Sequence, residues 1–161
     1  MKNLFAILLL FIGTSLTQDL TNDHLQVFEG SWTGTLTYLN YGDDETLVTL
    51  PVELEATFSK SGLDFVYLFT EPGGSIERRT GGIKLSGKKV YYSGKWELVG
   101  AEITDLNHWS LELIKTGKDN NRKSDFKQTM EVSPEKITGT KMVKYQDEGD
   151  FFMRNQYVFK R

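Results

Sequence analysis

The sequence predicts an all-β fold, an antiparallel up-and-down β-barrel of about eight to ten strands with a short N-terminal helical turn. Apolar and polar residues alternate with period two over most of the chain after residue 30, as expected for strands with one buried face. Short runs rich in Gly, Asn, Asp and Pro separate these segments. No long stretch shows the 3.6-residue period of an amphipathic helix. Short strands joined by turns in this way are typical of meander barrels and sandwiches.

The elements follow one another from a helical turn at residues 21–28, which Gly30 ends. The first strand covers residues 30–38. We expect further strands at residues 48–58, 63–69, 76–80, 83–85, 90–98, 103–114, 126–132, 137–145 and 151–159. Gly81 and Gly82 are interpreted as a break between two short strands, and Ser93 with Gly94 as a bulge.

The first 17 residues have the layout of a secretory signal peptide. Lys2 supplies a positive start, residues 4–12 form an apolar run, and residues 13–17 are mostly small or polar. Such a run spans about 14 Å as a helix, which is too short for a hydrocarbon core of about 30 Å. We therefore expect a signal peptide at residues 1–17 and a single barrel domain at residues 18–161. The mature protein is then secreted, periplasmic or extracellular, without an integral membrane segment.

Composition and motifs narrow the class of function. The chain has no cysteine, which excludes thiol catalysis and Cys-ligated metal. Its formal net charge is −3, so a nucleic acid is not expected as a partner. The sequence contains no Gly-x-Ser-x-Gly, Walker or His-Glu-x-x-His motif. No catalytic or metal-ligating residue is predicted, and a binding protein is expected rather than an enzyme.

A short helical turn, then Gly30-Ser31-Trp32 at the start of the first strand, then a meander to the C-terminus resembles the calycin superfamily. That group includes the lipocalins, the fatty-acid-binding proteins and the nitrobindin-like barrels. The resemblance implies that Gly30 and Trp32 are structural, with Trp32 packed at the closed end of the barrel beneath an interior ligand cavity. It also implies an Arg near the last strand that covers this Trp, and Arg154 is the match by position.

Candidate ligand-binding residues follow from alternation, because polar residues in phase with an apolar face point inward with it. Arg78, Gln128 and Lys141 are in phase with inward apolar residues, and a buried charge must be paired, hydrated or in contact with an anion. The resemblance to fatty-acid binders favours the contact with an anion. A register slip of one residue would instead turn each charge to solvent. The aromatic candidates for the cavity wall are Tyr38, Tyr67, Tyr92, Trp96, Trp109 and Tyr157, with plain core packing as the alternative for each.

The sequence thus predicts an exported barrel that binds a small, largely apolar, fatty-acid-like ligand in its interior. One alternative is a closed barrel that acts through its surface as an interaction module. The other is a haem-binding barrel, for which His24 and His108 are the two available histidines. His108 is next to Trp109 and is expected on the outer face, and no cofactor is otherwise predicted.

Overall fold

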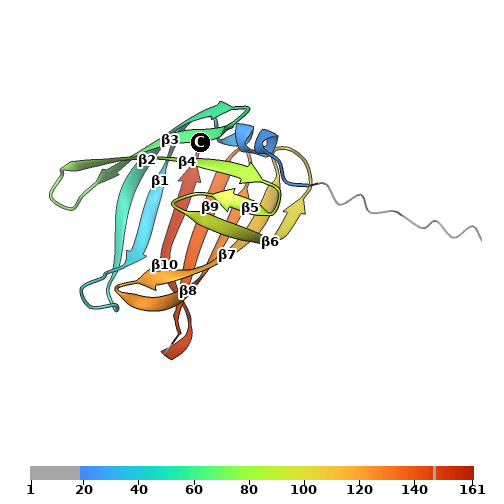
Figure 1. Cartoon of the computed structure of the whole chain (residues 1–161). Coiled ribbons are helices and arrows are strands. Elements are labelled where there is room, and N and C mark those ends of the chain that lie inside the picture. Colours follow the sequence, from blue (N-terminus) through green and yellow to red (C-terminus); the bar gives the residue numbers. More distant parts are fainter. Residues whose placement is uncertain (1–18, 147) are drawn as a thin grey trace, which may run out of the picture.

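The computed structural model describes residues 19–146 and 148–161, and within them ten antiparallel strands close into one barrel behind a short 3-10 helix (Figure 1). The elements are η1 (Asn22–Phe28), β1 (Gly30–Leu39), β2 (Leu47–Ser59), β3 (Gly62–Thr70), β4 (Ile76–Ser86), β5 (Lys89–Tyr91), β6 (Lys95–Ile103), β7 (Trp109–Asp119), β8 (Arg122–Val132), β9 (Lys136–Tyr145) and β10 (Glu148–Lys160). The predicted fold class is confirmed. The predicted signal peptide at residues 1–17 lies outside the described residues. No helix in the described part of the chain is long and apolar enough to cross a bilayer.

Each strand pairs with its neighbours in sequence, and β1 pairs with β10 to complete the ring. The closing pair runs in register from Thr33 opposite Lys160 to Tyr38 opposite Asn155. Gly34 is required at this junction, since a Cβ atom there would lie 2.0 Å from the carbonyl oxygen of Val158. The pairing of β1 with β10 therefore leaves no free edge at the junction between the first and last strands.

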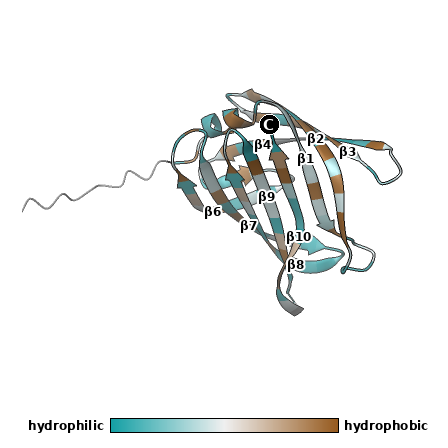
Figure 2. Cartoon of the chain, turned by 180° about the vertical axis from the view of Figure 1, so that it is seen from behind, coloured by the Kyte–Doolittle hydropathy of each residue, from teal (hydrophilic) through white to brown (hydrophobic). Residues whose placement is uncertain are grey.

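Alternation places the core inside the barrel. In β2 the side chains of Leu50, Val52, Leu54 and Ala56 are buried, and the residues between them are exposed. Figure 2 shows the same pattern as apolar bands that alternate with polar or pale bands along β1 and β2. The branched and aromatic residues suit this pleated, half-buried surface.

One end of the barrel is closed by η1 and Trp32. Trp32 is 1 % exposed, and its indole Nε1 donates a hydrogen bond to the carbonyl oxygen of Phe28 at 2.7 Å. The guanidinium that covers the indole belongs to Arg161, whose Cζ lies 4.1 Å from the ring centroid, rather than to Arg154. Arg161 also donates to the carbonyl oxygens of Val27 and Glu29, so it is held against the last turn of η1 and the residue that follows this helix.

Three predicted element boundaries are wrong. Strand β4 runs through Gly81 and Gly82 without a break. Residues 92–94 form the turn between β5 and β6 rather than a bulge. The expected long strand at residues 103–114 is divided by a turn, in which the Asp105 carboxylate accepts hydrogen bonds from the backbone N–H groups of Asn107 and His108.

Candidate functional site

The barrel encloses a cavity of about 290 Å³. Most of its wall is aromatic or aliphatic, with residues from eight strands, from the β5–β6 turn and from η1. The apolar wall residues include Phe28, Leu54, Leu63, Phe65, Ile83, Trp96, Met130, Ile137 and Phe159. Apolar walls with a few convergent polar groups are typical of small-molecule sites, and this volume is near the lower end of their usual range of about 300–1,000 Å³.

The exposed residues of the cavity wall, Arg79 and Ser93, lie at the side of the barrel, where the β5–β6 hairpin is short. Strand β4 pairs with β5 only between Lys84 and Ser86, and β7 pairs with β6 only as far as Ile114. Residues 76–83 and 115–119 therefore face each other across a gap without a described strand between them. Arg79, Ser93 and Lys115 line the cavity at this gap, and we refer to these three residues as the lateral mouth.

Two lysines point into the cavity from neighbouring parts of the wall. The Lys115 ammonium lies 4.0 Å from the Trp96 ring centroid and donates to the carbonyl oxygen of Ser93 at 3.3 Å. The ammonium groups of Lys115 and Lys141 lie 5.4 and 4.9 Å from the ring centroid of Phe126, so both flank one aromatic ring. Burial lowers the pKa of Lys115 below its usual 10.5, and repulsion from Lys141 lowers it further. Burial also lowers the pKa of Lys141, against the opposing attraction of Asp119.

The third cation of the wall is Arg79, at the rim. Its side chain is 66 % exposed and its Nη2 lies 2.9 Å from the carboxylate of Glu77. None of the described residues that line the cavity carries a carboxylate. The wall therefore presents three cations and no anion to a ligand, in a chain whose net charge is negative.

Three phenols add hydrogen-bond donors to the same wall. Tyr67 stacks on Tyr157 with ring centroids 5.5 Å apart, and Tyr92 lies beside Phe65 at 6.0 Å. Burial is the largest cause that raises the pKa of Tyr67, Tyr92 and Tyr157 above the ordinary 10.0. The phenols stay protonated at neutral pH and can donate to an acceptor atom. A ligand with an acidic or otherwise acceptor-rich head matches this set of donors.

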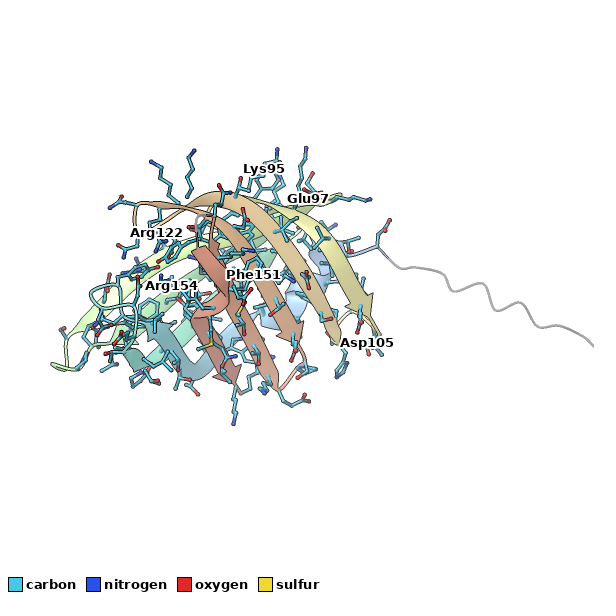
Figure 3. The ribbon with its side chains drawn as sticks, turned by 90° about the horizontal axis from the view of Figure 1, so that it is seen from below. Lys95, Glu97, Asp105, Arg122, Phe151 and Arg154 are labelled. Atoms are coloured by element: carbon cyan, nitrogen blue, oxygen red, sulfur yellow. The ribbon has the colours of Figure 1, made fainter. Side chains whose placement is uncertain are left out.

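The end of the barrel opposite η1 is closed by a buried ion cluster centred on Arg154. Arg154 is 0 % exposed, and its Nη1 and Nη2 atoms lie 2.7 Å from carboxylate oxygens of Asp44 and Asp119 respectively. Nη2 also donates to the hydroxyl of Tyr145 at 2.8 Å, and the Tyr41 ring lies 4.5 Å from the guanidinium carbon. The hydrogen bond from Arg154 holds the pKa of the Asp44 carboxyl below its usual 3.8. This cluster, labelled at Arg154 in Figure 3, fastens the β1–β2 loop over the barrel.

Six of the nine residues predicted to bind ligand or to form the cavity wall do line the cavity. They are Tyr67, Tyr92, Trp96, Gln128, Lys141 and Tyr157. Tyr38 is half-buried on β1 opposite Val48 and Asn155, outside the wall. Trp109 lies at the closed end, where its Nε1 donates to the carbonyl oxygen of His24 at 3.2 Å.

Arg78 is exposed on the outer face, so its predicted orientation is wrong by one residue. The inward residues of β4 are Arg79, Gly81, Ile83 and Leu85, which are alternate residues of one continuous strand. The polar wall residues that were not predicted from the sequence are Arg79, Ser93 and Lys115. The phase of Trp109, Leu111 and Leu113 on β7 leads directly to Lys115, and this signal was available in the sequence.

The residues around the cavity do not fit a haem. Haem iron in proteins is held by His, by Cys thiolate, by Met beside His, or by Tyr. His24 is buried in η1, where its Nδ1 accepts from the backbone N–H of Thr21 at 3.1 Å, and His108 lies in an exposed turn against Asp105. Neither histidine lines the cavity, the chain has no cysteine, and the cavity phenols hold their protons.

The described residues thus form a closed antiparallel β-barrel around an interior cavity with a mainly apolar wall. The structure is similar to that of Rv2717c from M. tuberculosis, with a TM-score of 0.61 and 13 % sequence identity over 89 % of this chain and 99 % of that one. At this identity the similarity shows the fold alone. No protein-family model matches the chain, and neither does any curated protein.

Proposed function

We propose that this protein is an exported barrel that binds one small, largely apolar molecule with an acidic head, of the fatty-acid type, in its interior. The observation that carries the proposal is a cavity of about 290 Å³ whose wall combines aromatic and aliphatic side chains with three cations and no described carboxylate.

The charges of the free protein support this ligand class. Lys115 and Lys141 are partly buried, and each has a lowered pKa because burial disfavours its charge. The pKa of Lys115 is lowered further by Lys141. An anion between the two ammonium groups relieves this repulsion and forms charge-assisted hydrogen bonds, which are stronger than neutral ones. The apolar part of the ligand then replaces water against Phe65, Ile83 and Phe159.

Export is the second part of the proposal, and the sequence of residues 1–17 supports it. A positive start, an apolar run and a small-residue end are the layout of a secretory signal. The absence of cysteine is compatible with an oxidising compartment, because the barrel has a continuous core of buried apolar residues and needs no disulfide.

The test is a titration with carboxylates and matching alcohols of increasing chain length, followed by tryptophan fluorescence. Carboxylate binding should change the emission of Trp96, which lines the cavity, and Trp96→Phe should abolish the response. Trp109→Phe should retain the response because Trp109 lies at the closed end.

The head-group contact is tested with Lys115→Met. Loss of a hydrogen bond to a charged group should weaken carboxylate binding about 10- to 100-fold and leave alcohol binding unchanged. Lys118→Met is the matched control, since Lys118 is exposed on the same strand and does not line the cavity. A flat response across the whole panel would overturn the proposal and favour a barrel that acts through its surface.

A further inference from the structure

Positive charge is concentrated in one segment of the chain. The residues from Arg78 to Lys95 include six Lys or Arg and no Asp or Glu, although the whole chain has a formal net charge of −3. The remainder of the chain is therefore strongly acidic. Such a separation of charge along a sequence favours one-sided binding to a polyanionic surface.

The fold gathers this segment on one face of the barrel. Lys84, Lys89 and Lys95 are exposed on β4, β5 and β6, which are neighbouring strands, and Lys88 is exposed in the β4–β5 turn. Tyr91 lies opposite Lys84 on one side and opposite Lys95 on the other, and its side chain is 42 % exposed. We call these four lysines and Tyr91 the basic face.

The lysines of the basic face form no ion pairs with other residues in the described part of the protein. No ion pair forms at Lys84, Lys88, Lys89 or Lys95 in residues 19–146 and 148–161. The acidic residue Glu97 of β6 lies opposite Lys89 of the basic face. Figure 3 shows Lys95 and Glu97 pointing away from the barrel, and Figure 1 shows β5 and β6 at the front of it.

We propose that the basic face docks on a membrane surface that contains anionic lipid. Lysines near such a surface are attracted to its negative potential, and an exposed Tyr side chain suits the boundary between head groups and acyl chains. An apolar cavity begins directly behind this surface, because Tyr92 follows Tyr91 in the chain and lines the cavity.

The position of the lateral mouth favours lipid over other polyanions. The mouth residues Arg79 and Ser93 belong to β4 and to the β5–β6 turn, so an amphiphile that leaves a bilayer reaches the cavity without crossing either closed end of the barrel. This choice of partner rests on the proposed function. Docking of the basic face by charge alone does not rest on it. Vesicle binding and ligand binding are therefore measured in separate experiments.

The test is co-sedimentation of the protein with vesicles of phosphatidylcholine, with and without phosphatidylglycerol, in the absence of any added ligand. Binding should require phosphatidylglycerol and should fall steeply with salt, because the Debye length shortens from about 10 Å at 0.1 M to about 3 Å at 1 M. The triple variant Lys84→Glu/Lys89→Glu/Lys95→Glu should lose on the order of a hundredfold in vesicle affinity. Its response to carboxylates in solution should be unchanged, since none of the three residues lines the cavity.

The matched control is Lys60→Glu/Lys136→Glu/Lys160→Glu, which makes the same change of net charge at exposed residues outside the basic face. This control should keep at least a third of the wild-type vesicle affinity. Equal losses in the two triple variants would overturn the proposal, as would equal binding to pure phosphatidylcholine. Tighter binding to heparin or single-stranded DNA than to anionic vesicles would also overturn it, in favour of a soluble polyanion.

Discussion

Replacing Arg154 with methionine should destabilise the barrel by about 3–5 kcal/mol, because it leaves a buried carboxylate without its main partner. The side chains of Arg154 and Asp119 are 0 % and 3 % exposed, and their charged atoms lie 2.7 Å apart. After the substitution Asp119 keeps the Tyr41 hydroxyl at 3.3 Å and the Lys141 ammonium at 3.8 Å. Neither replaces a guanidinium in direct contact. Asp44 is 33 % exposed and can turn to water, so the loss is concentrated at Asp119.

The assay is urea denaturation at neutral pH, followed by circular dichroism and fluorescence, for Arg154→Met, Asp119→Asn and the double variant. The double variant removes both charges, so it should be more stable than Arg154→Met by at least about 1 kcal/mol. Arg161→Met is the control, since Arg161 is an exposed arginine of the same chain that contacts an aromatic ring, and its loss should cost about 1–2 kcal/mol. Simple additivity of the two single variants would refute the reasoning, because the cluster would then not act as a unit.

Three further outcomes are expected. Trp32→Ala should cost about 3–5 kcal/mol in the same assay because the side chain is 1 % exposed, and a cost below about 1 kcal/mol would contradict its role at the closed end. Gly34→Ala should prevent regular β1–β10 pairing, with loss of cooperative unfolding, whereas Gly73→Ala, whose Cβ would meet nothing within 4 Å, should change stability by less than about 0.5 kcal/mol. The lowered folded-state pKa of Asp44 implies stability that is present above its ordinary pKa of 3.8 and lost as pH falls through the lowered value. Asp44→Asn should therefore be less stable at pH 7 and lose less stability on acidification, and parallel pH profiles for the two proteins would count against this.

Alternation was enough to predict the class of fold and much of the cavity wall. Residues such as Tyr67, Gln128 and Tyr157 lie in strands whose apolar neighbours fix the inward face, so their direction follows from period two. The prediction failed on β4, where Gly81 and Gly82 have the composition of a break. Gly81 is instead an inward residue of a continuous strand. A glycine is needed there because a Cβ atom would lie 2.6 Å from the ring of Phe65. The false break left Ile76 as the apolar residue that set the phase of residues 76–80. Because Ile76 is 67 % exposed on the outer face, its phase selected Arg78 in place of Arg79.

The ion cluster could not be found from local pattern. Arg154 and Asp44 are 110 residues apart, and Asp44 lies in a loop whose path alternation does not describe. The β9–β10 register also shifts between Met153 and Asn155, and this irregularity accompanies the inward position of Arg154. Long-range contacts at irregular positions depend on how loops fold over the end of the barrel, and period two carries no information on that.

The short β5–β6 hairpin also has a consequence for aggregation. Where it stops, residues 76–83 of β4 and 115–119 of β7 each keep one side free of a described strand partner, so the ring retains two short stretches of open sheet edge. Open edges invite pairing with other chains, and natural sheets protect them with charged side chains. Here Arg78 and Arg79 lie on one edge and Lys115 and Lys118 on the other. These four cations thus discourage strand pairing between copies of the protein. A substitution that neutralises several of them at once should be checked for self-association as well as for ligand binding.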